Sequence, residues 1–588
     1  MAARQAIRRA ALATTLRYLR ITPLFESIVE PMIVGLVVGV AAAIFGFLFS
    51  LYERSGAFVR SLLGDYSLFL SLALFAVTAY ALVALFGWYE GSSTNKYLEY
   101  YHFEAGRIGL AAALVFIIGS LVTVFAGGSV GPEGPALILG GILGYYMAQR
   151  LFSKHAYEAK EYGLIGAGAA VAAVFKAPFT AMTFVLEVLY RRDLETSVFL
   201  ETLVATVTAY LVSVALTGPT GITSVSIGGP LIPTMNDILA GVVAGLAATL
   251  VARIMVLSKH VFAEVSKPLS RISVLVGPTI LAMTIWLVGH QHPFILGGGE
   301  HVAVEAIHGK LELSGPEAII ASIEKAVLTT LTLTMGGTGG IFLPLVAIGG
   351  LLGYGLHELL PSLDLRTMVL ASTAGVFAGT NSVVISAVLF GVEVLGGHAF
   401  IPAALAATIA YVLSMGSSLH SNQLPRREVA KKLALASLLH RITENESFRR
   451  RLESISVLEA ANKNPIVFAS RTRAGEALRV AAERGHVAYP VVDDYKSMRL
   501  LGYVMLEDLI AVNPDTKLAE LARPAPVIKP DTPLLRAGLM MIRRDVDRLF
   551  ICDDEGRLLG LITKTDLLRT LMNIYEELLE KEIEKAFE

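Results

Sequence analysis

The sequence predicts an all-α polytopic membrane protein with duplicated halves and broken helices, followed by a smaller α/β region at the C-terminus. Three observations support this prediction: long apolar stretches without charge, a repeated pattern of glycine- and proline-rich breaks, and a change of composition near residue 430. Only 17% of the 588 residues are charged, whereas a soluble protein carries roughly 25%. The net charge of −1 argues against a nucleic-acid binder held by bulk positive charge.

Charge is distributed unevenly along the chain. Residues 1–430 hold 49 of the 99 charged residues, and residues 431–588 hold the other 50. The first region therefore has the composition of a membrane domain, and the second has that of a soluble domain. The single cysteine, Cys552, excludes an intrachain disulfide framework.

Seven charge-free stretches in the first region are long enough to cross a bilayer as a helix, which takes roughly 20 apolar residues. They are residues 31–52, 66–89, 108–132, 202–236, 272–299, 326–357 and 394–425. Any one of them would also fit a buried core helix, but seven together predict a polytopic helical protein.

Basic residues flank the predicted membrane domain, residues 31–430. Residues 1–30 contain five arginines on an amphipathic segment, which lacks the apolar core and cleavage site of a signal peptide. This segment is expected to form a helix on the membrane surface. Arg426 and Arg427 follow the last apolar stretch. By the positive-inside rule both ends are cytoplasmic, so the number of crossings is even.

Glycine- and proline-rich segments match each other, which indicates an internal duplication. Residues 135–145 match residues 344–354, which lie 209 positions later in the sequence. Residues 184–189 match residues 390–395, which lie 206 positions later. The duplicated halves are expected at about residues 30–215 and 235–415. Paired broken helices of this kind mark transporters whose site lies between the repeats.

Both breaks have the features of an anion site. Pro135 and Pro344 each open an apolar helix after a loop of small residues, and proline suits the first helical position. The free N–H groups of such helix starts attract anions. Because neither loop contains a basic residue, we expect a site that also lets its ion leave.

Glu133 lies in the first of these loops, directly at the helix start. A carboxylate at membrane depth costs roughly 2.5–3.5 kcal/mol, so it is a functional candidate by default. The ionised side chain would occupy the position of an anion, and the protonated one would leave it, which describes a gate. The alternative is an ordinary cap that holds the loop amides.

Two other clusters are weaker candidates. Ser92 lies in residues 90–96, where it would cap a helix or offer its hydroxyl to an anion. His420 lies in residues 416–423, at the end of the last apolar stretch. Its side chain would either reach inward or remain at the interface.

The segments 131–135 and 340–344, in this order and at this spacing, resemble motifs of the CLC family of chloride channels and proton-coupled chloride exchangers. The resemblance covers nearly the whole chain. It implies a homodimer with one anion pathway in each subunit, and two inverted halves in each membrane domain.

Carried over by position, the resemblance makes Glu133 the gating glutamate. Ser92 matches a serine that contacts the central anion, and His420 falls where the family has a tyrosine that closes the inner end. The backbone amides implied to cradle the anion are those of Gly134, Ile341 and Phe342.

Several positions depart from the family pattern. Residues 93–95 read Ser-Thr-Asn instead of Gly-Ile-Pro, which leaves fluoride and nitrate open beside chloride. His420 replaces the tyrosine, so a leakier or pH-dependent inner barrier is expected, and Pro132 replaces a common arginine. Val188 stands where well-studied exchangers have the inner proton-transfer glutamate. It favours a channel, although some exchangers lack that glutamate.

Three charged residues near these motifs are expected to lie outside the anion pathway. Glu187 and its repeat mate Glu393 are expected to be structural carboxylates near helix ends. Lys176 is expected at the cytoplasmic face rather than in the pore.

The charged C-terminal region contains a second, smaller duplication at an offset of 58 residues, in which Gly560 and Asp566 repeat Gly502 and Asp508. Each unit reads as a mixture of strands and helices. This resembles a tandem pair of CBS domains, which CLC proteins often carry in the cytoplasm. The predicted boundaries are a helical linker at residues 431–462, CBS units at 463–515 and 523–575, and a charged helix at 576–588.

A CBS pair often binds an adenine nucleotide between its units. Thr563 and Asp566 fit the usual Gly-x-x-Thr-x-x-Asp signature for ribose and phosphate, whereas Met505 replaces the threonine in the first unit. The alternative is a structural pair that mediates dimer contacts.

The expected function is chloride transport gated by Glu133 and regulated through the tail, with a channel preferred over a chloride/proton antiporter. A divalent-cation transporter would need several facing carboxylates, and Glu133 alone lies in a central broken loop. The apolar stretches exclude a soluble CBS enzyme, and no catalytic constellation is found. No cofactor is required, and chloride is the transported ion.

Overall fold

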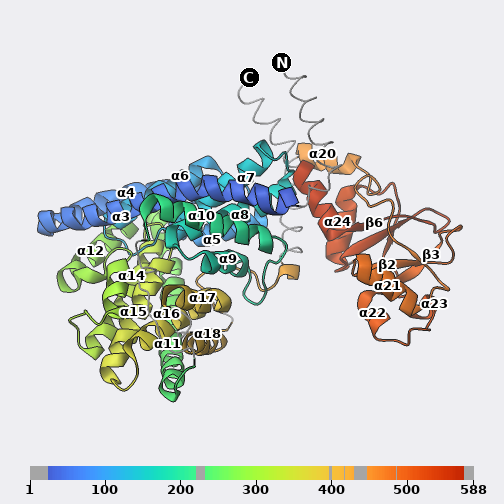
Figure 1. Cartoon of the computed structure of the whole chain (residues 1–588). Helices are drawn as coiled ribbons and strands as arrows, with labels where there is room; N and C mark the ends of the chain where they lie inside the picture. The colour runs from blue at the N-terminus through green and yellow to red at the C-terminus, as the bar shows by residue number, and fades with distance from the viewer. Residues whose placement is uncertain are drawn as a thin grey trace. The chain divides into compact units, whose positions relative to one another are not determined.

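A computed structural model describes residues 24–219, 232–395, 400–415, 417–429, 446–484 and 486–574. The chain divides into two compact units, residues 1–427 and 428–588. The described part of the first unit is helical, and both three-stranded sheets belong to the second (Figure 1). The predicted C-terminal helix, most of the predicted N-terminal surface helix, and residues 431–445 of the predicted linker fall outside the described residues.

The first half of the helical unit runs from residue 25 to residue 217. Its elements are η1 (Phe25–Val29), α3 (Glu30–Leu63), η2 (Gly64–Tyr66), α4 (Ser67–Phe86), α5 (Ser93–Phe103), α6 (Leu110–Phe125), α7 (Glu133–Arg150), α8 (Ala156–Phe175), α9 (Pro178–Glu187) and α10 (Phe199–Thr217).

The second half runs from residue 235 to residue 413. Its elements are α11 (Met235–Ile272), α12 (Val276–Gln291), η4 (Pro293–Ile295), α13 (Glu300–Ile307), α14 (Gly315–Thr334), α15 (Phe342–Leu359), α16 (Leu365–Asn381), α17 (Val384–Leu395) and α18 (Phe400–Leu413).

The predicted apolar stretches do not each form one helix. Four described segments are long and apolar enough to cross a membrane: Phe25–Phe86, Phe199–Thr217, Met235–Ile272 and Phe342–Leu359. The stretch 326–357 instead contains the end of α14, a break and most of α15. Glycine causes such breaks: Gly127 and its repeat mate Gly336 have φ angles of 95° and 109°, a conformation that side chains other than hydrogen disfavour.

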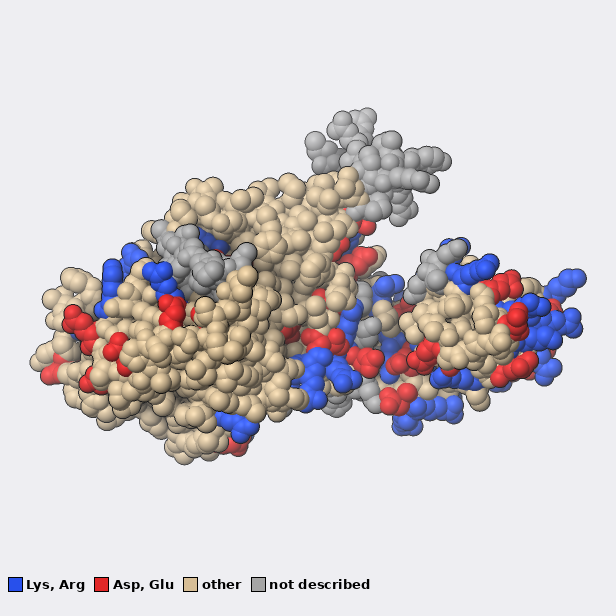
Figure 2. Space-filling model, turned by 60° about the horizontal axis from the view of Figure 1, so that its bottom comes forward, with Lys and Arg blue, Asp and Glu red and all other residues tan. Residues whose placement is uncertain are grey.

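The surfaces of the two units differ as the charge distribution predicts. Large apolar side chains are exposed along the long helices of the first unit, among them Phe47, Phe69, Leu211 and Leu250. Figure 2 shows a mostly uncharged surface on this unit and a dense mixture of acidic and basic residues on the other. An apolar exterior is what contact with lipid requires.

The two halves of the helical unit are joined through equivalent carboxylates. Glu187, at the end of α9, accepts hydrogen bonds of 2.8 to 3.0 Å from the backbone N–H groups of residues 384–386, at the start of α17. In return, Glu393 of α17 accepts bonds of 2.9 and 2.8 Å from residues 179 and 180, at the start of α9. The prediction that both are structural carboxylates at helix ends is confirmed.

The second unit repeats one strand pattern twice. β1 (Phe468–Ala469), β2 (Ala488–Val492) and β3 (Leu500–Met505) form one sheet, and β4 (Val527–Ile528), β5 (Arg548–Cys552) and β6 (Leu558–Thr563) form the other. In each, the first pair of strands is parallel and the second is antiparallel. The helices among them are α20 (Glu446–Ser454), α21 (Ala474–Arg484), α22 (Leu506–Ile510), α23 (Leu518–Leu521) and α24 (Leu534–Arg543).

The two repeats of this unit pack on each other symmetrically. The N–H of Leu500 donates to Gly556 O at 3.0 Å, and the N–H of Leu558 donates to Met498 O at 2.9 Å. Cys552 lies in the apolar cluster between the repeats and is 3% exposed. Burial raises the pKa of its thiol to about 11, so this cysteine is a protonated core residue.

Candidate anion site

The two broken loops meet at equivalent residues. Gly131 and Gly340, which are 209 positions apart, exchange two backbone hydrogen bonds of 2.9 and 2.8 Å. This pairing brings the starts of α7 and α15 together inside the protein, where all residues of both loops are buried. Two helix N-termini therefore converge, as the anion-site prediction requires.

Glu133 occupies the space between these helix starts. It is the first residue of α7 and is 1% exposed. Its Oε1 accepts a hydrogen bond from the N–H of Phe342, the first residue of α15, and its Oε2 has no hydrogen-bond partner among the described residues. The carboxylate thus caps the helix of the opposite half, in the position that favours negative charge.

The loop glycines leave room for this carboxylate. A Cβ atom built on Gly340 would collide with Glu133 and lie 2.6 Å from the backbone nitrogen of Gly134. Gly134 at the start of α7, and Ile341 and Phe342 at the start of α15, are all buried. The structure thus brings together the residues predicted to cradle an anion.

Aromatic rings close the site on one side. The ring centroid of Phe342 lies 4.1 Å from that of Phe175, 4.5 Å from that of Phe377 and 5.0 Å from that of Phe390. These rings come from α8, α16 and α17. Phe175, Phe342 and Phe390 also line a cavity of about 840 Å³, so they form a wall shared by the site and that cavity.

Ser92 brings a third helix start to the site. It is the N-cap of α5, and its Oγ accepts a hydrogen bond of 3.3 Å from the N–H of Asn95. The N–H of Ser93 donates to Gly339 O at 3.2 Å, which ties this loop to the second broken loop. A small space of about 10 Å³, here called the Ser92 cavity, is lined by Ser92, Met255, Lys259, Thr330, Leu333, Ile341 and Leu419.

His420 reaches inward rather than remaining at the interface. Its side chain is 0% exposed, and Nε2 lies 2.7 Å from Oδ1 of Asn381. Its Nδ1 has no hydrogen-bond partner among the described residues. The preceding residue, Leu419, lines the Ser92 cavity, so the chain brings His420 next to this part of the site.

Lys259 is a residue of this site that the sequence analysis missed. It lies within α11, and its ammonium group donates a hydrogen bond to Leu419 O. The predicted anion site was drawn from the two broken loops alone, and these loops contain no basic residue. The available signal was a lysine inside a long apolar helix, but sequence spacing does not show where such a side chain points.

Lys176 lies at the start of α9, beside a large cavity. It precedes α9, donates to Gly218 O, and lines a cavity of about 840 Å³ together with Pro132 and Phe342. The other end of α9 leads to Arg191, whose N–H donates to Leu424 O at 2.8 Å, beside the basic segment that follows the last apolar stretch. The position of Lys176 at the cytoplasmic face stays a prediction.

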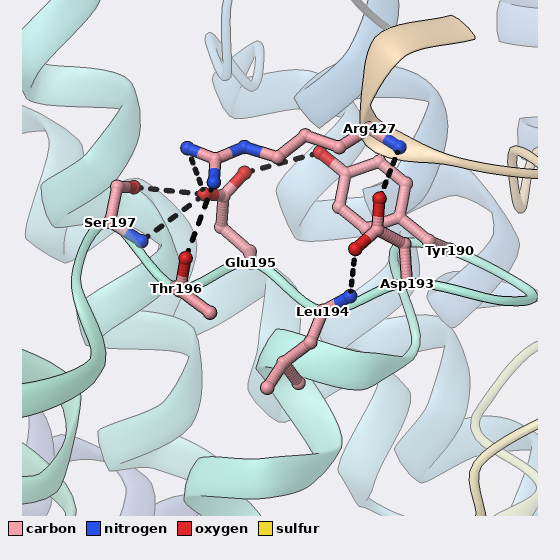
Figure 3. Close-up of polar contacts among 7 residues, drawn as sticks. All are labelled: Tyr190, Asp193, Leu194, Glu195, Thr196, Ser197 and Arg427. Atoms are coloured by element: carbon pink, nitrogen blue, oxygen red, sulfur yellow. Dashed lines mark hydrogen bonds and ion pairs between the residues drawn. The ribbon is translucent and has the colours of Figure 1, made fainter. Parts of the chain in front are cut away.

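The segment after the last apolar stretch is anchored beyond α9. Glu195, which is 5% exposed, accepts a hydrogen bond of 3.1 Å from the hydroxyl of Tyr190 and forms an ion pair of 2.8 Å with Arg427 (Figure 3). The backbone N–H of Arg427 donates to Asp193 at 3.0 Å. Arg427, at the end of the helical unit, is therefore held to the loop between α9 and α10.

Thr563 and Asp566 contact each other in the second unit. Oδ2 of Asp566 accepts bonds of 3.0 and 2.7 Å from the N–H and the hydroxyl of Thr563. The N–H of Asp566 donates to Thr563 Oγ1 at 3.2 Å, so the pair caps the helix that begins at residue 564. A cap gives this signature a structural role, and nucleotide binding stays a prediction.

Comparison with known proteins decides the family. A model of the voltage gated chloride channel family matches residues 74–415. The chain belongs to this family. Models of the CBS domain match residues 457–515 and 518–573 of the second unit. The predicted CLC family, the helical membrane fold and the mixed α/β CBS region are thus confirmed, and this family consists of anion transport proteins rather than enzymes.

Relatives within the family differ in activity. The chain is 25% identical to the H(+)/Cl(-) exchange transporter ClcA of Vibrio parahaemolyticus, over 57% of this chain and 71% of that protein. It is 26% identical to a chloride/fluoride channel protein of Pseudomonas syringae pv. tomato, over 57% and 75%. It is 28% identical to the voltage-gated ClC-type chloride channel ClcB of Escherichia coli O81, over 59% and 84%.

Solved structures support the same fold. A CLC-type fluoride/proton antiporter is 23% identical with a TM-score of 0.58, over 68% of this chain and 98% of that chain. A eukaryotic CLC transporter is 15% identical with a TM-score of 0.53, over 92% and 98%. These likenesses concern the fold alone.

Proposed function

We propose that this CLC protein is a chloride channel with one anion pathway in each subunit, gated by Glu133. The observation that carries this proposal is the carboxylate of Glu133, which fills the space between the two helix starts and caps the helix of the opposite half. An ionised carboxylate competes there with an anion. Protonation removes its charge, so the side chain yields the position to chloride.

The inner end of α9 supports a channel rather than an exchanger. Val188 is 0% exposed and has no titratable group. The adjacent carboxylate, Glu187, is held by three backbone N–H groups and by the hydroxyl of Ser386 at 2.7 Å. A carboxylate fixed by four hydrogen bonds is a poor mobile proton carrier, so this region offers no substitute for the missing glutamate.

One feature favours the alternative, a chloride/proton antiporter. A cavity of about 720 Å³ is lined by Glu90, Asn95, Lys96, Ser421 and Asn422, among others. Glu90 is 9% exposed and lies two residues before Ser92. Its carboxylate would supply a proton acceptor next to the inner end of the pathway, independently of Val188.

The reversal potential under a pH gradient separates the two functions. In liposomes or planar bilayers with a fixed chloride gradient, a channel is expected to keep its reversal potential at the chloride equilibrium value when the pH on one side changes. A shift of the reversal potential with pH would establish proton coupling. Glu90→Gln would then be the variant that tests the alternative route, with Glu104→Gln as its control in the same cavity.

The selectivity among anions follows from the same preparation. Residues 93–95 depart from the family sequence, and the structure buries all three. Efflux of chloride, fluoride and nitrate from liposomes, with and without a proton ionophore, tests the assignment of chloride. The proposed homodimer rests on family resemblance, and crosslinking in membranes tests it. The proposed cytoplasmic termini rest on the basic residues that flank the membrane domain, and protease accessibility of the tail tests them.

The CBS pair is proposed to regulate transport, with an adenine nucleotide as the candidate ligand. Asp566→Ala removes one of the two partners that cap the helix, at a cost of up to about 1 kcal/mol, and removes the predicted ribose contact. We expect a lower melting temperature and, if ATP or AMP binds, loss of the calorimetric signal. Asp508→Ala is the matched control, because Asp508 accepts a bond of 2.9 Å from Met505 N–H but lacks the threonine. Absence of nucleotide binding to the wild-type protein would leave the pair structural.

A further inference from the structure

We infer that Lys259 is an anion-binding residue of the pathway, which contacts the transported ion in the Ser92 cavity. This inference rests on the proposed anion transport and adds a full positive charge to a site otherwise formed by helix starts. The position is distinct from that of Glu133, because Lys259 lies at the Leu419 side of the cavity.

The composition of the cavity supports an anion as its occupant. Six of its seven lining residues are neutral, and the seventh is Lys259. The wall includes Ser92, which has a hydroxyl group, and Ile341, which is the N-cap of α15. No carboxylate lines this space, so a negative solute meets one cation, hydroxyl groups and a helix start.

The hydrogen bonds of Lys259 leave donors for a solute. An ammonium group has three N–H donors, and among the described residues its acceptor is Leu419 O. The space accommodates about one water-sized solute, so an entering halide must contact its walls. His420, which follows Leu419, adds a buried Nδ1 without a partner among the described residues.

Nearby charges moderate the attraction. Among the described residues, Glu90 and His420 are the titratable groups that interact electrostatically with Lys259. The carboxylate of Glu90 partly offsets the ammonium charge, so an anion is held less tightly than by an isolated lysine. This resolves the conflict with the expectation that a basic residue would trap the ion.

The competing explanation is structural: Lys259 would only hold the Leu419 carbonyl in place. Crystals of the wild-type protein grown in bromide distinguish the two, since bromide can be located by anomalous scattering. We expect a peak in contact with the ammonium group of Lys259. A map with bromide elsewhere in the pathway and none at Lys259 would refute this inference and leave the proposed function intact. A pathway without any bromide, together with absent flux, would refute both.

Variants test the charge separately from the hydrogen bond. Lys259→Gln keeps an N–H donor for Leu419 O but removes the charge, and it is expected to weaken chloride binding by roughly 10- to 100-fold in calorimetry. Lys259→Arg keeps the charge and should remain within about threefold of wild type. Lys267→Gln is the matched control, because Lys267 lies on the same helix with a half-exposed side chain.

A folded Lys259→Gln variant that binds chloride like the wild type would contradict the inference. A cooperative thermal melt in the absence of chloride, measured on the same samples, shows which variants are folded. The bromide map depends on none of these variants.

Discussion

Glu133→Ala is expected to leave anion flux in place and to remove its dependence on pH. In the wild type, the ionised carboxylate occupies the helix starts, so chloride efflux from liposomes should rise as the pH falls and Glu133 becomes protonated. Alanine has neither the charge nor the length to reach Phe342 N–H, so the position stays open to chloride at every pH. Flux of the variant between pH 5 and 8 should equal or exceed that of the wild type at its most acidic.

Glu300→Gln is the control for this experiment. Glu300 lines the cavity that also contains Lys176, Pro132 and Phe342, but the carboxylate that accepts the hydrogen bond from Phe342 N–H is that of Glu133. Glu300→Gln should retain the pH dependence of the wild type. If Glu133→Ala instead preserves both the flux and its pH dependence unchanged, the assignment of Glu133 as the gate is wrong.

Gly340→Ala is expected to stop transport and to lower thermal stability. The new methyl group would meet the Glu133 carboxylate and lie 2.6 Å from Gly134 N. The side chain can move away, but the backbone nitrogen belongs to the start of α7 and cannot do so without breaking the paired bonds between Gly131 and Gly340. Overpacking of this kind costs about 1–3 kcal/mol, and the separated helix starts no longer converge on one point.

A glycine ten residues further on provides the comparison. A Cβ built on Gly350 of α15 would lie 3.4 Å from its nearest neighbour, Ala303 Cα, which is an ordinary contact. Gly350→Ala should therefore transport and melt like the wild type. Both variants can be compared by efflux and by thermal denaturation in detergent. Wild-type flux in Gly340→Ala would show that the convergence of the helix starts is not required.

The fold class could be predicted because its causes are local in the sequence. Apolar stretches without charge must lie in lipid or in a core, and the breaks contain glycines such as Gly127 and Gly336, which adopt conformations that other residues avoid. The repeat showed that Gly131 and Gly340 are equivalent. It could not show that they bond to each other, since that depends on how the halves pack.

The parts that could not be predicted depend on the direction of side chains across long sequence distances. Lys259 is 160 residues from its acceptor Leu419, and no periodicity relates the two. The contact of Lys176 with Gly218 O is also absent from the sequence, because a short helix such as α9 has no charge pattern that shows where the residue before it points. His420 had two equally good readings, and the hydrogen bond to Asn381 decides between them.

The reciprocal bonds between the halves also limit how this molecule can work. Glu187 and Glu393 each fasten one half to the other, and Gly131 and Gly340 do the same near the centre. In a rocking-bundle transport cycle, one half rotates as a rigid body against the other. Such a rotation would break all of these hydrogen bonds between the halves in every transport cycle. Rotation of a single side chain such as Glu133 breaks only the hydrogen bond that this side chain itself makes, so the proposed gate can operate while the two halves stay joined.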